Sequence, residues 1–217
     1  MLPEFADFNA LLQRSKVLME DRHGIKVLAT PDGEIVKLFR RKRLLSSALW
    51  DPYAKRFARN AASLKKLGIP TVEVTGLWRV SPLKRDAVVY RRMEGESLRD
   101  LEKTDARMEQ FARFVAELHA KGVFFRSAHF GNILELPDGR FGLIDMADLT
   151  CKGRPLGVKE RLRNFAHLVR YQVDRQAFDA FGMEKFLGFY EAASGLEGWR
   201  LEGFKRQVRK QLTATAG

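Results

Sequence analysis

Two short apolar runs on either side of a turn place the strongest constraint on how this 217-residue chain folds. The runs cover residues 132–136 and 141–144, and the turn between them is Pro137-Asp138-Gly139. Proline fixes φ, aspartate tolerates turn geometry and glycine adopts φ > 0, so this pattern predicts a β-hairpin. A hairpin returns its two ends to the same place. We therefore expect Asn132, at the start, and Asp145, just after the end, to lie side by side.

The two residues at the open end of this hairpin suit a divalent cation. Asn132 supplies an amide oxygen and Asp145 supplies a carboxylate. Both are hard oxygen ligands of the kind that Mg²⁺ prefers. The sequence therefore predicts a Mg²⁺ site at Asn132 and Asp145.

The composition is that of a globular protein with a strong excess of positive charge. The chain is 45% hydrophobic and 30% charged, and its 39 Lys and Arg against 27 Asp and Glu give a formal net charge of +12. Such an excess attracts polyanions: nucleic acid, acidic membrane surfaces or phosphorylated sugars. The charge alone does not choose among these partners.

Two features indicate the compartment. The single cysteine, Cys151, excludes an internal disulfide and favours a reducing environment. The first 16 residues include early acids and no long apolar run, so they do not resemble a secretory signal. No stretch approaches the roughly 18 apolar residues that a membrane helix needs. We expect a cytoplasmic protein, with any membrane contact peripheral.

The N-terminal part of the chain predicts an antiparallel sheet accompanied by helices. Apolar residues at helical spacing predict a short helix over 5–13, and Asp51 followed by Pro52 reads as the N-cap of a second helix that ends before Gly68. Short β-rich runs separated by turn residues predict five strands. These strands cover residues 16–20, 25–30, 34–39, 71–80 and 87–93.

The C-terminal part is mostly helical apart from the hairpin. Apolar stripes at helical spacing predict helices over residues 105–121, 158–171, 178–194 and 198–212. His119 lies near the C-terminus of the first of these helices, where a partly positive side chain is favoured. We interpret it as a structural residue.

Residues 122–149 resemble the catalytic segment of the protein-kinase-like superfamily. In that family a catalytic Asp is followed five residues later by an Asn, and a metal-binding Asp ends the next hairpin. Asn132 matches the Asn, and Asp145-Met146-Ala147 matches the D-F-G triplet. The resemblance implies a bilobal α+β protein-kinase-like fold. Residues 1–93 would form an N-terminal antiparallel sheet lobe with one helix, and residues 94–217 a mostly helical C-terminal lobe.

The same resemblance implies an ATP site. Lys37, in Ile-Val-Lys-Leu-Phe, resembles the V-A-I-K strand of kinases, whose Lys pairs with the nucleotide phosphates. On pattern alone, a solvent-facing strand residue is the better interpretation of Lys37. The segment from Asn132 to Asp145, in the right order and at the right distance downstream, favours the kinase interpretation instead. Residues 94–98 resemble the hinge of small bacterial sugar kinases. Backbone groups of Tyr90, Arg91 and Met93 would then hold the adenine edge of ATP.

Three departures from the kinase pattern put catalysis in question. Ser127 occupies the place of the catalytic Asp. The second predicted helix contains no Glu to pair with the strand Lys, and only Gly24 stands where kinases have a glycine-rich loop. His129 titrates near neutral pH, so it could be the general base that Ser127 cannot be, or a structural or phosphate-side residue. Arg126 reads equally as a clamp on an anionic acceptor and as a surface residue.

The nearest resemblance is to the bacterial lipopolysaccharide-core kinase-like proteins, which include proteins labelled toluene tolerance proteins. It implies an ATP- and Mg²⁺-dependent phosphotransferase whose acceptor is an anionic sugar of the lipopolysaccharide core or another phosphorylated sugar. Such a protein would contact the cytoplasmic face of the inner membrane peripherally. The alternative is a pseudokinase, a nucleotide-binding or regulatory module without phosphotransfer. A nucleic-acid binder ranks last, since only the net charge favours it.

Overall fold

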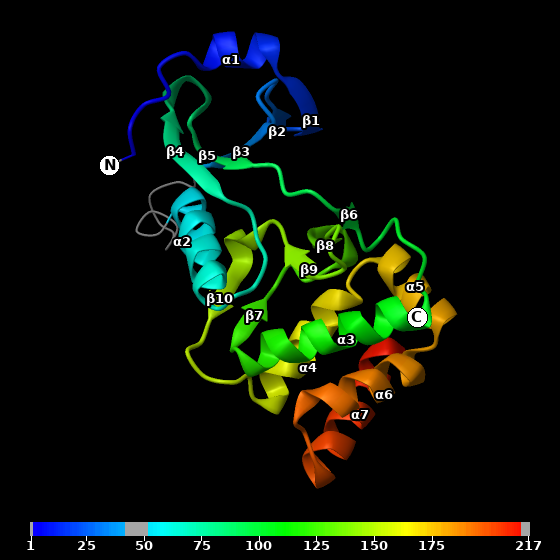
Figure 1. Ribbon diagram of the computed structural model, residues 1–217. Helices are drawn as coiled ribbons and strands as arrows, with labels where there is room; N and C mark the ends of the chain where they lie inside the picture. The colour runs from blue at the N-terminus through cyan, green and yellow to red at the C-terminus, as the bar shows by residue number, and fades with distance from the viewer. Residues whose placement is uncertain (1, 42–51, 214–217) are drawn as a thin grey trace. The chain divides into compact units, whose positions relative to one another are not determined.

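The computed structural model of this chain describes residues 2–41 and 52–213 (Figure 1). The chain divides into two compact units, Met1–Glu94 and Gly95–Gly217. The first is built around an antiparallel sheet and the second is mostly helical, so the predicted α+β class is confirmed. The assignment of nucleotide binding to residues 1–93 and of catalysis to residues 94–217 stays a prediction.

The N-terminal unit contains a five-stranded antiparallel sheet with the order β1-β2-β3-β5-β4. The first three strands form the predicted meander, in which successive runs pair with their neighbours along the chain. The last two strands begin within three residues of their predicted starts. The strands are β1 (Lys16–Asp21), β2 (Gly24–Ala29), β3 (Glu34–Arg40), β4 (Val74–Val80) and β5 (Arg85–Arg91), with a short 3₁₀ turn, η2 (Ser81–Leu83), between β4 and β5.

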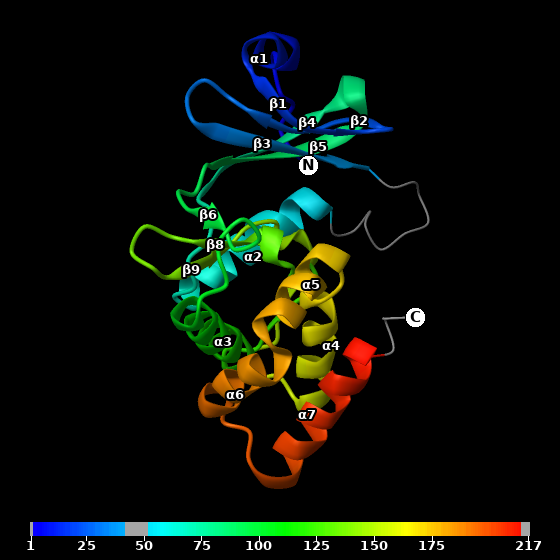
Figure 2. The ribbon, with the colours of Figure 1, turned by 90° about the vertical axis from the view of Figure 1, so that its right-hand side faces the viewer.

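Two helices cover opposite faces of this sheet (Figure 2). The first, α1 (Phe8–Arg14), is the predicted short helix, and its Phe8 packs with Val36 of β3 in one apolar cluster. The chain before α1 is tied to β4, because the Phe5 amide donates to the Arg79 carbonyl over 2.7 Å. The unit therefore contains α1 in addition to the one helix that the resemblance to kinases implies for this lobe.

The second helix, α2 (Tyr53–Lys66), packs on the other face of the sheet through aromatic side chains. Its Phe57 stacks on Tyr90 of β5, with ring centroids 5.2 Å apart, and also contacts Phe39 of β3. The expected N-cap, Asp51, lies outside the described residues. The buried side of this helix contains Ala54, Phe57, Asn60, Ala61 and Leu64.

Over residues 95–213, the C-terminal unit is built from five helices and two small sheets. The helices are α3 (Asp105–Ala120), α4 (Val158–Leu168), α5 (Gln172–Phe181), α6 (Met183–Ser194) and α7 (Gly198–Thr213). The sheets are β6-β8-β9 and β7-β10, formed by β6 (Glu96–Ser97), β7 (Val123–Phe125), β8 (Ile133–Glu135), β9 (Phe141–Leu143) and β10 (Leu149–Cys151). Two 3₁₀ turns, η3 (Phe130–Asn132) and η4 (Met146–Asp148), flank the hairpin. Buried phenylalanines from several of these elements contact one another at the centre of the unit.

The prediction of one helix over residues 178–194 was wrong. The segment is divided between α5 and α6 at Gly182, whose φ is +100°. The apolar stripe continues across the break, because Phe178 and Phe186 are both fully buried and contact each other edge to face. Helical periodicity therefore could not locate the turn. Among the described residues, no helix is both long and apolar enough to cross a membrane.

The turn that leads from α3 into β7 requires glycine at position 122. Gly122 has φ +72°, and an added Cβ would lie 2.1 Å from the carbonyl oxygen of Arg154. We expect Gly122→Ala to lower the free energy of unfolding by about 2–4 kcal/mol, since left-handed strain adds to a backbone clash. Gly153→Ala is the matched control. Gly153 has φ +67° with nothing within 4 Å, so it should lose only the strain contribution of about 1 kcal/mol. Urea unfolding measures both, and equal losses would contradict the clash.

Candidate active site

The predicted hairpin is present and joins its two ends as expected. Strands β8 and β9 pair from Ile133↔Leu143 to Glu135↔Phe141. At the open end, the Ile144 amide donates to the Asn132 carbonyl over 3.0 Å. Asn132 therefore lies directly beside the residue that precedes Asp145.

Asp145 adopts a backbone conformation that is rare for a residue with a side chain. Its φ and ψ are 59° and 52°, in the left-handed region. Among the described non-glycine residues, only Lys84 shares a positive φ. Such strain costs on the order of 1–3 kcal/mol and concentrates at functional sites, where the surrounding structure enforces it. Here Asp145 turns the chain from the hairpin into η4 and on to β10, which pairs with β7.

The amide of Asn132 is oriented by the segment that carries Ser127. Its Nδ2 donates to the Ser127 carbonyl over 3.0 Å, and its backbone amide donates to the His129 carbonyl over 2.9 Å. Because Nδ2 is committed as the donor, Oδ1 is the atom that is left to accept or to bind a cation. The side chain is 7% exposed, so its orientation is set by the fold.

This donor set fits a Mg²⁺ ion shared with substrate phosphates. An amide oxygen and one carboxylate are hard ligands, and Mg²⁺ is commonly bound through one or two carboxylates, waters and phosphate oxygens. Within the described part of the chain, no three His, Cys, Asp or Glu side chains gather into a metal-binding group. The residues present therefore fit a metal that arrives with a nucleotide better than an all-protein metal cage.

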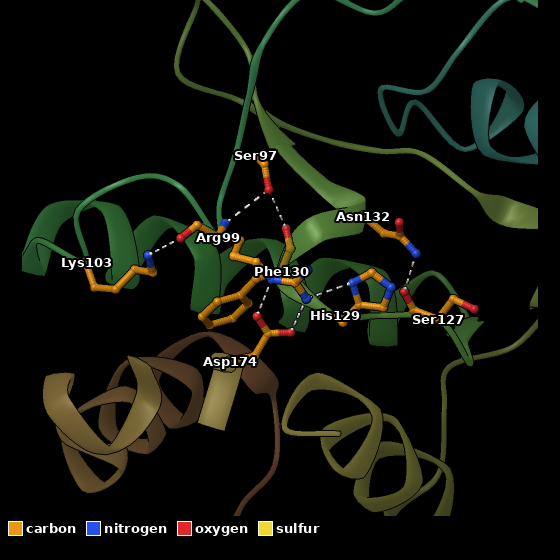
Figure 3. A network of polar contacts seen from close by, with 8 residues as sticks. All are labelled: Ser97, Arg99, Lys103, Ser127, His129, Phe130, Asn132 and Asp174. Atoms are coloured by element: carbon orange, nitrogen blue, oxygen red, sulfur yellow. Dashed lines mark hydrogen bonds and ion pairs between the residues drawn. The ribbon is translucent and has the colours of Figure 1, made fainter. Parts of the chain in front are cut away.

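An ion pair between the partly exposed Arg99 and a fully buried carboxylate lies beside this segment and reaches His129 (Figure 3). Asp174 of α5 is fully buried and accepts two hydrogen bonds from Arg99, from Nε and from Nη2, each 2.8 Å long. The Nη2 of Arg99 also lies 3.4 Å from Nδ1 of His129. The Tyr171 ring and the imidazole pack edge to face, with centroids 4.8 Å apart.

The surroundings of His129 disfavour its charged form. Partial burial lowers the pKa of His129 below its usual value, and the Arg99 charge lowers it further, while the carboxylates of Asp174 and Asp145 act in the opposite direction. The hypothesis that His129 is the general base stays a prediction. The nitrogen that faces Arg99 is not available for that task, because it already accepts a hydrogen bond.

Nothing local in the sequence indicates that Arg99, Tyr171 and Asp174 belong to this cluster. Arg99 and Asp174 are 75 positions apart, and no local pattern links them. Asp174 lies in the short stretch between two predicted helices, where it reads as a surface acid.

In the N-terminal unit, Lys37 lies on the sheet face covered by α2. It pairs with Val88 of β5, and its neighbours Val36 and Leu38 point to the opposite face, into the cluster under α1. Its Nζ lies 5.8 Å from the centroid of the Phe39 ring. Lys37 is therefore on the face of the sheet that α2 covers, where it is partly exposed.

The expected adenine contacts are close to Lys37 in the sheet. Tyr90 pairs with Ile35, two positions from Lys37, and its ring is buried against α2. The Arg91 amide already donates to the Glu73 carbonyl over 2.9 Å. If Arg91 binds adenine through its backbone, it therefore does so through its carbonyl group. The roles of Tyr90, Arg91 and Met93 in adenine binding stay predictions.

The turn where kinases have a glycine-rich loop is a tight hairpin. Asp21 pairs with Gly24, which leaves only Arg22 and His23 in the loop. The Asp21 carboxylate accepts the His23 amide over 2.9 Å, and Gly24 has φ +94°. The expected departure from the kinase pattern is thus present as a short, internally bonded turn.

Comparisons with known proteins identify the fold. No family model matches the sequence, and no curated protein matches it either. The crystal structure of an aminoglycoside-3'-phosphotransferase of type VIII is similar over 91% of this chain and 93% of that chain, with a TM-score of 0.60 and 14% sequence identity. The chain has a protein-kinase-like fold. The bifunctional kinase-methyltransferase WbdD is also similar over 86% of this chain, with a TM-score of 0.50 and 11% identity, and the match spans 47% of that protein.

At these identities the likeness establishes the fold and no closer relationship. The predicted protein-kinase-like fold is confirmed, and the narrower resemblance to lipopolysaccharide-core kinases stays a prediction. The order of a sheet unit, a hairpin and a helical unit follows that fold. The assignment of residues to the candidate site depends on the geometry of this chain and not on the similar structures.

In this protein-kinase-like fold, a buried relay of hydrogen bonds supports the segment before Ser127. The donors and acceptors have fixed directions. Arg161 donates to the Tyr190 hydroxyl, which donates to Nδ1 of His119, and Nε2 of His119 donates to the Asn164 carbonyl oxygen. The Asn164 amide then donates to the Phe125 carbonyl over 2.7 Å.

The expectation that His119 is partly positive was wrong, although its structural role is confirmed. Burial, followed by the charge of Arg161, lowers the pKa of His119 to about 3. The side chain is 0% exposed, so desolvation outweighs the favourable position near a helix C-terminus. Its neutral form is part of the relay.

This relay makes stability depend on pH. The pKa of His119 is about 3 when folded, and that of an unfolded His is about 6.5. The unfolded chain binds the proton first, so stability falls as pH drops below about 6.5, by about 2 kcal/mol at pH 5. His119→Gln should be less stable at pH 7 but should lose less between pH 7 and pH 5. Urea titrations at both pH values measure this, with exposed His23→Gln as the control. If His119→Gln lost as much stability between pH 7 and pH 5 as the wild type, the pH dependence would not come from His119.

Proposed function

We propose that this protein is an ATP- and Mg²⁺-dependent phosphotransferase. The observation that supports this most is the joining of Asn132 to the hairpin end that presents Asp145 in a strained left-handed conformation. Phosphoryl transfer requires little covalent work from the protein, since it depends on positioning and charge stabilisation. Two oxygen ligands on one rigid hairpin meet that requirement.

Each residue has a proposed role in this reaction. Asn132 and Asp145 would hold Mg²⁺, which would neutralise the charge of the nucleotide phosphates. Lys37 would contact those phosphates, and backbone groups at Tyr90 and Met93 would contact adenine. Each of these roles is a proposal. It is transferred from the resemblance to kinases, and the local geometry at each position is compatible with the role.

A group of arginines near the candidate site supports an anionic acceptor. The pKa of His167 is lowered by burial and then by the charges of Arg126, Arg170 and Arg163, while Asp148 raises it, so all three guanidinium groups act electrostatically on one imidazole. All three arginines are exposed. Guanidinium groups bind carboxylates and phosphates through paired hydrogen bonds. We therefore propose a phosphorylated or carboxylated sugar, with the lipopolysaccharide core as the first candidate.

The partner and location follow from that acceptor. A lipopolysaccharide precursor is held at the inner membrane, so the protein would work in the cytoplasm and contact that surface peripherally. The net charge of +12 favours such contact with an acidic surface. Nucleic acid remains the less favoured polyanion.

The second candidate is a pseudokinase, and one observation favours it. Ser127 offers no carboxylate, and the Nδ1 lone pair of His129 already faces Arg99. The described geometry therefore presents no evident general base. Nucleotide binding would survive in such a protein without transfer to an acceptor.

A thermal-shift titration with ATP and Mg²⁺, followed by turnover assays with phosphorylated sugars, separates the candidates. At 100 times its dissociation constant a nucleotide adds about 2.7 kcal/mol, which raises Tm by about 5–10 °C. Lys37→Ala should reduce this shift, and Lys66→Ala, an exposed lysine on α2, is the control. A shift without turnover supports the pseudokinase. No shift with any nucleotide rejects both candidates.

A further inference from the structure

We propose that His129 is a neutral hydrogen-bond donor through Nε2 and that Arg99 and Asp174 are positioning residues that hold it in this form. The inference rests on the proposed phosphotransferase function and assigns the part of the site where Ser127 replaces a carboxylate. It begins with the contact between Arg99 and the imidazole, 3.4 Å from Nη2 to Nδ1 (Figure 3).

The contact selects one tautomer. A guanidinium has only donors, so Nδ1 of His129 must accept the hydrogen bond from Arg99. A proton on Nδ1 would point a second donor at a cation. The single proton of the neutral ring therefore lies on Nε2, and the ring can donate from that atom but cannot accept there.

The clamp that sets the tautomer is rigid. Asp174 is fully buried and holds Arg99 through two parallel hydrogen bonds of 2.8 Å. Arg99 also lies 5.5 Å from the centroid of the Tyr171 ring, and the same ring packs on His129. An added Cβ at Gly131 would lie 2.9 Å from Nη1 of Arg99, so glycine leaves the room that the guanidinium needs.

The donor faces the side of the ring where Ser127 lies. In Figure 3 the imidazole is placed between the guanidinium of Arg99 on one side and Ser127 on the other. In the kinases that this segment resembles, the position of Ser127 carries the Asp that accepts the hydroxyl proton. Here the same place would receive an N–H donor.

A donor can serve phosphoryl transfer without a base. In a loose transition state, the acceptor oxygen–phosphorus bond forms as the bond from phosphorus to the bridging oxygen of ADP breaks, and charge spreads over the phosphoryl oxygens. The Nε2–H of His129 would stabilise that charge by a preorganised hydrogen bond. The acceptor proton passes to water. Ser127 is then tolerated because no carboxylate is needed to take the proton.

The tautomer can be measured without any activity. Two-bond ¹⁵N–¹H spectra of the protein labelled with ¹⁵N-histidine distinguish a protonated ring nitrogen from an unprotonated one, and His129→Gln assigns the signal among four histidines. At neutral pH we expect His129 to carry its proton on Nε2. The double variant Arg99→Met/Asp174→Leu removes the buried pair together, which keeps the interior neutral. It should show a mixture of tautomers. A proton on Nδ1 in the wild type, or an unchanged spectrum in the double variant, overturns the clamp.

A kinetic comparison tests the donor role. Glutamine places an N–H near the position of Nε2, so His129→Gln should keep kcat within about tenfold of wild type, whereas His129→Phe should lose about 10²-fold. If His129 were the base, both variants would lose activity alike. The kcat of the wild type would then change with pH as His129 titrates, and this pH dependence would be absent from both variants. Equal losses overturn the donor role.

The two measurements separate failure of this inference from failure of the proposed function. Turnover in the wild type together with the wrong tautomer rejects the clamp and leaves the phosphotransferase intact. The expected tautomer in a protein that turns over no acceptor upholds the clamp and rejects both the transfer reaction and the donor role that depends on it.

Discussion

Replacing Asp145 by Asn should abolish Mg²⁺-dependent phosphotransfer while leaving the protein fully folded. The carboxylate is the one full negative charge that the hairpin end offers to a metal, next to the neutral amide of Asn132. A metal that bridges nucleotide phosphates contributes several kcal/mol to the transition state, so we expect kcat/KM to fall by about 10³-fold or more. The ATP-induced rise in Tm should lose its dependence on Mg²⁺.

The folded state should tolerate this change because asparagine accepts the left-handed conformation well. Asp145→Gly should even raise the free energy of unfolding, by about 1 kcal/mol, since it removes the strain at φ 59°. The control is Asp138→Asn at the hairpin turn, which removes the same charge from a carboxylate paired only locally with Arg140. Unchanged turnover in Asp145→Asn, or an equal loss in Asp138→Asn, would show that the metal ligand lies elsewhere.

Replacing Arg99 by Met should lower the free energy of unfolding by about 3–5 kcal/mol. Asp174 is fully buried and both of its oxygens accept from Arg99. Removal of the cation leaves a buried carboxylate without its partner charge. Removing one partner of a buried ion pair typically costs about 3–5 kcal/mol of stability. For a chain of this size the expected fall in Tm is about 6–20 °C.

The double variant Arg99→Met/Asp174→Leu should recover most of that loss, because an apolar pair no longer leaves an uncompensated charge. Arg113→Met is the matched control. Arg113 pairs with Glu109 on the exposed side of α3 and should cost at most about 0.5 kcal/mol. Thermal and urea unfolding of the wild type and these three variants measure the loss and its recovery. If the double variant were as unstable as Arg99→Met, the loss would come from packing and not from the stranded carboxylate.

The hairpin and the relation of Asn132 to Asp145 could be predicted because they depend on local chemistry. Pro137, Asp138 and Gly139 determine a turn within a few residues, and the pairing of the flanking strands follows from the turn. The three-stranded meander before residue 40 was predictable for the same reason. The resemblance to kinases, which covers roughly residues 16–171, then predicted the class of fold, which no local pattern contains.

The remainder depended on contacts between distant parts of the chain. The role of Asp174 depends on α5, which places it against Arg99. The lowered pKa of His119 depends on its burial in the interior of the C-terminal unit. The turn at Gly182 was hidden by an apolar stripe that passes through it. The left-handed backbone of Asp145 had no signal in the sequence either, since aspartate is compatible with many conformations.

The attachment of the chain before α1 to the sheet has a practical consequence for protein engineering. The Phe5 amide binds the Arg79 carbonyl, and Phe8 and Leu11 complete the apolar cluster on one sheet face. A shortened protein that starts at the first strand would present that face to water. Each of these two side chains contributes about 1.5–3 kcal/mol through burial. Trimming the first fifteen residues to improve crystals would therefore yield a protein that aggregates, and a loss of activity in it would say nothing about catalysis.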